Sequence, residues 1–132
     1  MSYDLHVVKS TDFVRLDAKG NVDFEESRRV LSDLARTCFA RGIDRALLDI
    51  RKVPNATLKL AEVYALARTF GEMGFQRHQR VAVLHSYSST DRADFFVMCT
   101  ADQGFDISAF DQFEDAAEWL SRPEVEMKIP VQ

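Results

Sequence analysis

The sequence predicts a single α/β domain with a mixed five-stranded sheet, in the order β-β-α-β-α-β-α-β-α. Three observations carry this prediction. Residues 45–50 and 80–85 are short, almost continuous apolar runs, as expected of buried parallel strands. Apolar side chains at helical spacing follow each run. The length of 132 residues is ordinary for one hydrophobic core.

The first part of the chain predicts an antiparallel hairpin followed by a helix. Residues 5–9 and 13–17 are rich in Val, Leu and Phe and form the two predicted strands. Asp23 is a suitable N-cap, because glutamates fill the next turn, where the helix dipole favours negative charge. Gly42 suits the C-cap position of the same helix.

The middle of the chain predicts two further strand and helix pairs. Residues 45–50 form the central strand of the sheet, and the breaker segment 54–57 introduces the second helix, which should end near Phe75. Residues 80–85 form the fourth strand. The polar segment 86–91 then supplies N-cap residue types for the third helix.

The last part of the chain predicts one more strand and one more helix. Gly104 ends the third helix, and residues 105–110 form the fifth strand. Asp111 is the expected N-cap of the fourth helix, and Arg122-Pro123 ends it. Because each strand after the hairpin returns through a helix, these strands should lie parallel.

Composition and charge limit the classes of function that the chain can have. The formal charge is −4, from 21 acidic and 17 basic side chains, and no basic stripe is present that would bind nucleic acid. There is no signal-peptide pattern, and no apolar run approaches the roughly 20 residues of a membrane span. We therefore expect a cytoplasmic protein with one domain over residues 1–122 and a C-terminal tail over residues 123–132.

The sequence predicts no metal and no cofactor. Cys38 and Cys99 lie far apart in predicted helices and lack the Cys-x-x-Cys spacing of zinc or redox sites. His6, His78 and His85 belong to separate elements without a second ligand at short spacing. The glycines are scattered singly, so the usual phosphate-binding loops are absent.

Three short motifs identify a family resemblance. They are Leu-Leu-Asp at 47–49, Arg-Val-Ala-Val at 80–83, and an ending from Phe110 to Leu120 with the spacing Phe-x-x-x-Glu-x-Ala-x-x-Trp-Leu. With the element order, they make the chain resemble STAS-like domains of the anti-sigma-factor antagonist type, the SpoIIAA-like superfamily. The closer likeness is to a bacterial branch of stand-alone domains of unknown function. Such motifs specify a fold better than a function.

The resemblance also implies a position for regulation by phosphorylation. In the phospho-regulated members, an Asp-Ser-Ser or Asp-Ser-Thr unit begins the helix after the central strand. In this sequence Thr57 and Leu58 occupy the matching positions, so the usual acceptor serine is missing. Thr57 could in principle substitute as the acceptor, but the simpler expectation is a plain N-cap that needs no modification.

The carboxyl ends of the third and fourth strands are the predicted binding site, because ligands of open α/β sheets usually bind there. Asp49, Arg51 and Lys52 are expected to extend from the central strand into a turn. Asp49 would shape the loop, basic groups would meet an anion or an acidic partner, and hydroxyls would hydrogen-bond it. The simpler alternative is that the basic groups are solvated or pair with Asp49 and Asp91. The predicted binding residues are Asp49, Arg51, Lys52, Thr57, His85, Ser86, Ser89 and Arg92.

The preferred function is a non-enzymatic regulatory or ligand-binding module. It would act through protein contacts, or through a small anionic or lipid ligand, at the loops after the third and fourth strands. One alternative is a small hydrolase in which His85 activates a serine of the following loop and Asp49 orients the imidazole. No Gly-x-Ser-x-Gly elbow supports it. Another alternative is an apolar-ligand or lipid carrier, which would need a deep apolar pocket.

Self-association is a further expectation, because two predicted helices have more apolar side chains than one buried face can hold. Some of this apolar area should therefore be exposed and available for a dimer interface. The residues concerned are Tyr64, Leu66 and Phe70 in the second helix and Phe95, Phe96 and Met98 in the third.

Overall fold

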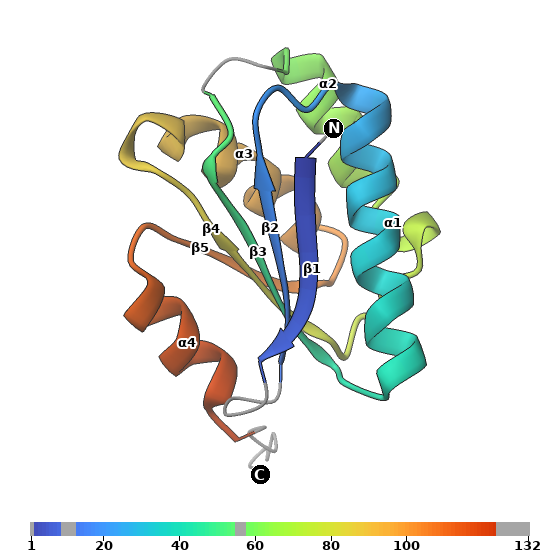
Figure 1. Ribbon diagram of the computed structural model, residues 1–132. Helices are drawn as coiled ribbons and strands as arrows, with labels where there is room; N and C mark the ends of the chain where they lie inside the picture. The colour runs from blue at the N-terminus through green and yellow to red at the C-terminus, as the bar shows by residue number, and fades with distance from the viewer. Residues whose placement is uncertain (1, 9–12, 55–57, 124–132) are drawn as a thin grey trace, which may run out of the picture.

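The sheet has its five strands side by side in chain order (Figure 1). The computed structural model describes residues 2–8, 13–54 and 58–123. The first two strands are antiparallel, and each later pair is parallel. The predicted single-domain α/β fold with a mixed sheet is confirmed, and the predicted central strand lies in the middle. The strands are β1 (Ser2–Val8), β2 (Phe13–Lys19), β3 (Arg45–Lys52), β4 (Arg80–Leu84) and β5 (Asp106–Phe110).

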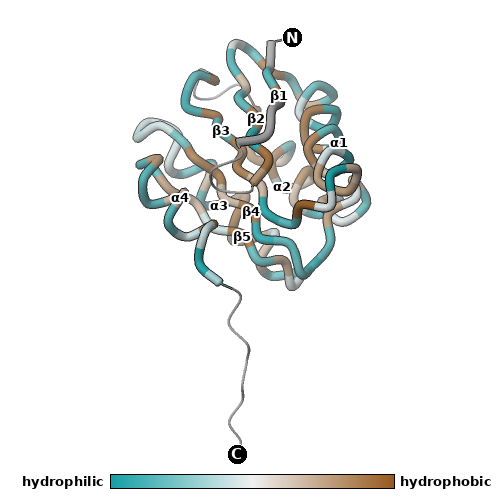
Figure 2. The backbone as a smooth tube through the Cα atoms, turned by 60° about the horizontal axis from the view of Figure 1, so that its bottom comes forward, coloured by the Kyte–Doolittle hydropathy of each residue, from teal (hydrophilic) through white to brown (hydrophobic). Residues whose placement is uncertain are grey.

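The helices cover the two faces of the sheet unequally (Figure 1). Three helices pack on one face, α1 (Phe24–Arg41), α2 (Leu60–Arg68) and α3 (Thr90–Ala101). On the other face lies α4 (Phe113–Ser121). Figure 2 shows hydrophobic segments along the central strands and hydrophilic segments on the outer turns of the helices. None of the helices in the described ranges is long and apolar enough to cross a membrane.

Alternation along β3 divides the core into two clusters. Successive side chains of a strand point to opposite faces. Ala46 and Leu48 belong to the cluster under α1, α2 and α3, whereas Leu47 belongs to the cluster under α4. The same alternation directs Asp49 to the α4 face and Ile50 to the opposite face. This division decides which site residues can meet.

The end of β3 differs from the prediction. The strand continues through Asp49 and Arg51 to Lys52, because Lys52 still pairs with Lys19 of β2 after an irregularity in register. Asp49 is consequently buried, with 6% of its surface exposed. The expectation that Asp49 extends into a turn is therefore wrong.

The caps of α1 agree with the sequence. The backbone N–H of Glu26 donates to the Asp23 carboxylate at 2.8 Å, and the Glu26 side chain accepts from the Asp23 backbone at 3.3 Å. At the other end, Gly42 adopts a left-handed conformation with φ of 65°, which suits glycine. The first helix is thus defined by local chemistry.

The predicted end of α2 near Phe75 is wrong, because the helix ends at Arg68. The Thr69 hydroxyl donates to the carbonyl of Ala65 at 2.9 Å, and a short 3-10 turn, Gly71–Met73, follows. The turn brings the rings of Phe70 and Phe75 into a stack with centroids 4.1 Å apart. Aromatic packing in the core therefore overrides continued helical periodicity.

The predicted N-cap of α4 is also wrong. The N-cap position belongs to Gln112, and Asp111 lies one residue outside the helix. Gln112 makes no side-chain capping hydrogen bond, and Phe110 and Phe113 on either side of this start both pack against the cluster under α4. The start of α4 therefore carries no capping signal of the kind that Asp111 suggested.

Candidate functional site

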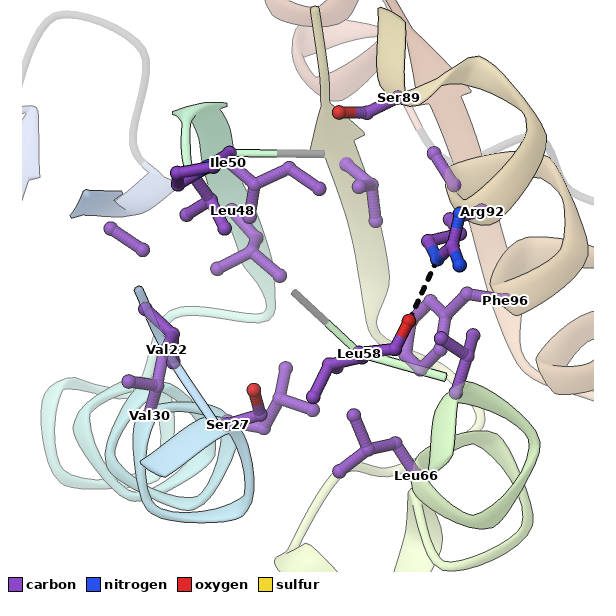
Figure 3. Close-up of a pocket in the computed structure, with 17 residues that line it drawn as sticks. Val22, Ser27, Val30, Leu48, Ile50, Leu58, Leu66, Ser89, Arg92 and Phe96 are labelled. Carbon is purple, nitrogen blue, oxygen red and sulfur yellow. Dashed lines mark hydrogen bonds between the residues drawn. The ribbon is translucent and has the colours of Figure 1, made fainter. Parts of the chain in front are cut away.

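An apolar cavity of about 140 Å³ lies at the carboxyl ends of β2, β3 and β4 (Figure 3). It lies between the sheet and helices α1, α2 and α3 and is partly open to solvent. Among the side chains that line it, Ser27, Ser89 and Arg92 are polar and the rest are apolar. An apolar cavity of about 150 Å³ stays dry and can hold a benzene-sized molecule. The apolar wall includes Leu48, Ile50, Leu58, Leu66, Val83 and Phe96.

Several small side chains line this cavity. They are Ala18 near the end of β2, Ser27 near the start of α1 and Ala93 in α3. Dense packing is the norm in protein interiors, so an unfilled apolar volume at a strand-end edge is a candidate ligand site.

Arg92 is the charged residue at the cavity. It comes from the first turns of α3, and its Nε donates to the backbone carbonyl of Leu58 at 2.8 Å (Figure 3). The contact holds the segment after β3 against α3. Within the described residues, Arg92 forms no ion pair, although Asp91 and Asp94 are its neighbours in sequence. Its positive charge is therefore not neutralised by the protein there.

The serines before α3 bond mainly to one another. The Ser86 hydroxyl lies 3.1 Å from the Ser88 hydroxyl and 3.3 Å from the Ser89 hydroxyl. Ser89 is buried, with 7% of its surface exposed, and it lines the cavity. These contacts make a compact polar turn beside Arg92.

His85 is buried and its ring bonds to backbone. Nδ1 lies 2.8 Å from the carbonyl oxygen of Ser86, and because a carbonyl only accepts, Nδ1 carries a proton. The His85 backbone N–H donates to the carbonyl of Phe110 at 2.9 Å. Among the described residues, no serine hydroxyl hydrogen-bonds to this imidazole. The geometry gives no support to a Ser–His pair.

A charged cluster forms on the other face of the sheet, around Asp49. Arg51 donates to the Asp49 carboxylate from Nε at 3.0 Å, from Nη2 at 2.8 Å and from its backbone N–H at 3.0 Å. Arg15 of β2 donates from Nη2 to the same carboxylate at 2.9 Å and from Nε to Asp17 at 2.8 Å. The Arg15 guanidinium lies over the ring of Phe113, 5.1 Å from its centroid.

This cluster has a definite electrostatic consequence. Burial alone would raise the pKa of Asp49, but hydrogen bonds from Arg51 and the charges of Arg51 and Arg15 outweigh it and hold the pKa below its usual value. The hydrogen bond to Asp49 raises the pKa of Arg51 in turn. Asp49 is therefore an ionised anchor between β2 and β3, and Arg51 forms the pairing that was the simpler alternative to a binding role.

The predicted binding residues share one edge of the sheet but are divided between its faces. Asp49 and Arg51 lie on the α4 face, whereas Ser89 and Arg92 lie at the cavity on the opposite face. Lys52 is exposed at the end of β3, and Thr57 lies outside the described residues. The expectation that Asp49 and Arg51 join Arg92 in one binding surface is not supported, because strand alternation separates them.

Sequence reasoning missed Arg15, Phe113 and the apolar wall of the cavity. Arg15 and Asp17 stand two residues apart in β2, a spacing that places both on one face of a strand. That spacing could have predicted a charged cluster beside Asp49 once the pairing of β2 with β3 was known. Phe113 had no such signal, because its contact depends on where α4 crosses the sheet.

A second, more open cavity of about 480 Å³ lies between α3, α4 and β5. Its lining includes the carboxylates of Asp94, Asp115 and Glu118 together with Trp119 and Arg122. Arg122 and Glu118 approach to 3.8 Å. The remaining carboxylates make this region negative, so it does not share the charge character of the Arg92 cavity.

Comparisons with known proteins find similarity in the fold. No family model and no curated protein sequence matches the chain. Among solved structures, an anti-sigma factor antagonist from Mycobacterium paratuberculosis matches over 90% of this chain and 94% of its own, with a TM-score of 0.58 and 16% identity. The unphosphorylated anti-sigma factor antagonist SpoIIAA matches over 89% and 94%, with a TM-score of 0.50 and 16% identity. The chain has a SpoIIAA-like fold.

A third match points the same way. It is an uncharacterised protein with a SpoIIAA-like fold from Shewanella loihica, with a TM-score of 0.57 and 18% identity over 89% of this chain and 93% of that chain. The resemblance predicted from the sequence motifs is thus confirmed at the level of the SpoIIAA-like fold. At these identities the likeness establishes the fold alone, and function has to be argued from the site.

Proposed function

We propose that this chain is a non-enzymatic regulatory module that binds a small, largely apolar ligand at the carboxyl edge of its sheet. The observation that carries the proposal is the apolar cavity of about 140 Å³ between the sheet and α1, α2 and α3. Ligands of open α/β sheets bind preferentially at this edge. A molecule of roughly benzene size would fill the cavity.

The proposal accounts for the site better than hydrolysis does. A hydrolase of the Ser–His type needs a serine hydroxyl within reach of an imidazole nitrogen. Here Nδ1 of His85 bonds to a backbone carbonyl, and the hydroxyls of Ser86, Ser88 and Ser89 bond to one another. Binding needs only the cavity, whereas catalysis would need these groups to be rearranged.

Regulation would follow from what the ligand touches. Val53, Pro54 and Leu58 line the cavity and flank residues 55–57. In the phospho-regulated members of the family that the sequence resembles, the start of the helix after the central strand is phosphorylated. The surroundings of the corresponding segment are therefore a natural place for regulation. A ligand packed against Leu58 would alter the surface that this segment offers to a protein partner. Two of the similar structures are named as anti-sigma factor antagonists, which favours a protein partner for this module.

A second candidate function is self-association, and exposed apolar side chains favour it. Tyr87 is 86% exposed, Met98 60%, Leu60 52% and Tyr64 46%. Leu60 and Tyr64 lie on α2 and Met98 lies on α3, two helices that pack against each other. Native mass spectrometry tests this directly: a mass at twice the chain supports a dimer, and a monomer across the micromolar range contradicts it.

The ligand proposal is tested with a neutral apolar probe. Hexan-1-ol should raise the melting temperature of the wild-type chain in a concentration-dependent way, because a ligand that binds the native state stabilises it. Ala93→Leu fills the cavity and should abolish this shift. Ala101→Leu makes the same change at an exposed position of the same helix and should keep it. A wild-type chain that gives no shift up to the solubility limit of the alcohol contradicts the proposal.

A further inference from the structure

We infer that the ligand of this cavity is an amphipathic anion whose carboxylate or phosphate binds the guanidinium of Arg92 while its apolar part fills the cavity. The inference rests on the proposed function and gives it a chemical class. A short-chain or ring-bearing carboxylic acid, or the phosphate monoester of a similar alcohol, has this chemistry.

The first support is the missing partner of Arg92. Four arginines in the described residues are half-buried, namely Arg15, Arg45, Arg80 and Arg92. Arg15 bonds to the carboxylate of Asp49 at 2.9 Å. Arg45 and Arg80 approach carboxylates of neighbouring residues at 3.8 and 3.5 Å, respectively. Arg92 has no carboxylate partner among the described residues. Half-burial of an unpaired cation is costly, so an anion from outside would stabilise it.

The second support is the geometry of the guanidinium. The bond from Nε to the carbonyl of Leu58, 2.8 Å long, fixes the orientation of the side chain (Figure 3). Neither Nη atom hydrogen-bonds within the described residues. These two nitrogens can donate together to the two oxygens of one carboxylate or phosphate. Arg92 therefore offers a pre-oriented fork at the cavity.

The third support is the polarity of the remaining lining. Besides Arg92, the polar residues of the lining are Ser27 and the buried Ser89, which comes directly before α3. Away from this end, the wall is aliphatic or aromatic, including Leu48, Leu66 and Phe96. One charged end and one apolar body are the features of an amphipathic ligand, and a polar nucleotide would leave its base and sugar unpaired there.

The experiment compares three probes of equal chain length, hexanoate, hexyl phosphate and hexan-1-ol, by isothermal titration calorimetry. We expect at least one anion to bind the wild-type chain about tenfold or more tightly than the alcohol, as expected of a charge-assisted hydrogen bond. A preference for hexanoate identifies a fatty-acid-type carboxylate, and a preference for hexyl phosphate identifies a phosphate ester. Either preference supports the inference.

Two variants assign the preference to Arg92. Arg92→Gln should bring the anions down to the affinity of hexan-1-ol, while alcohol binding shows that the cavity is intact. Arg36→Gln removes a positive charge from an exposed arginine on α1 and should leave the preference unchanged. If Arg92→Gln also loses the alcohol, Arg92→Lys provides the second test, because a lysine keeps the cation and should retain an anion preference.

The experiments distinguish failure of the anion inference from failure of the proposed ligand-binding function. Equal binding of anions and alcohol to the wild-type chain overturns the inference and leaves the apolar-ligand function standing. An anion preference that survives in Arg92→Gln, or that is absent from a folded Arg92→Lys that binds the alcohol, also overturns it. Absence of binding by every probe overturns the proposed function and the inference together.

Discussion

Asp49→Asn tests whether the charged cluster on the α4 face joins β2 to β3. Asp49 is 6% exposed, and its carboxylate accepts four hydrogen bonds, one from Arg15 and three from Arg51. Removing one member of a buried ion pair costs about 3–5 kcal/mol. The Arg51 side chain is 41% exposed and can return to water, so its share must be discounted. Arg15 keeps its bond to Asp17. We therefore expect a loss of about 2–3 kcal/mol in the free energy of unfolding.

The measurement is urea unfolding at pH 7, followed by circular dichroism. Asp17→Asn is the matched control, because Asp17 belongs to the same cluster but its side chain is 37% exposed, and its loss should cost less than about 1 kcal/mol. An Asp49→Asn variant that loses no more than Asp17→Asn would refute the view that Asp49 is the anchor of the cluster.

The same residue predicts a pH dependence. The folded-state pKa of Asp49 lies below the value of about 4 that it has in the unfolded chain, so the unfolded state takes up the proton first on acidification. The contribution of Asp49 to stability is therefore complete above about pH 4 and is lost as the pH falls through the folded-state pKa. Between about pH 5 and pH 2, wild-type stability should fall more steeply than that of Asp49→Asn, and parallel curves would contradict the sign.

Three further predictions concern packing and thiol reactivity. Ala93→Leu adds three carbons at the cavity; their burial contributes about 2.4 kcal/mol and the lost rotamer entropy costs up to about 1 kcal/mol, so the free energy of unfolding should rise by about 1.5 kcal/mol. The same change at Ala67, which is fully buried away from the cavity, should lower the free energy of unfolding by about 1–3 kcal/mol. Thermal unfolding that ranks the two variants in the opposite order would refute the cavity. Phe70→Ala removes a ring that is fully buried against three others and should cost about 3–5 kcal/mol in urea unfolding, whereas a cost below about 1 kcal/mol would exclude it from the core. Burial, with a smaller effect of Asp44, raises the pKa of Cys38 to about 12, so iodoacetamide should modify the half-buried Cys99 well before Cys38 in the native state, and mass spectrometry that finds the reverse order would contradict this environment.

The exposed apolar surface was predicted in outline from the helical pattern. Tyr64 and Met98 are exposed, whereas Leu66, Phe70 and Phe96 are buried. The sequence could show that one face of each helix had too little room for all of these side chains. Which of them face outward depends on how α2 and α3 lie on the sheet, and only the packed structure shows that.

The sequence by itself determined the features that depend on local chemistry. Asp23 and Gly42 cap α1 as predicted, because capping requires only the side chain or glycine at the right position. The apolar run before Asp49 predicted the central strand, and the alternation of strands and helices predicted a mixed sheet whose later strands are parallel. Short-range patterns of this kind were enough to predict most of the fold.

Only the tertiary structure decided the site. Asp49 and Arg92 are predicted neighbours at one edge, yet strand alternation sends Asp49 to the α4 face, where Arg15 of another strand pairs with it. The small side chains that line the cavity come from separate elements, Ala18 on β2, Ser27 on α1 and Ala93 on α3. These residues are far apart in the chain, so no local pattern links them. A space left empty between packed elements exists only once the elements are in place.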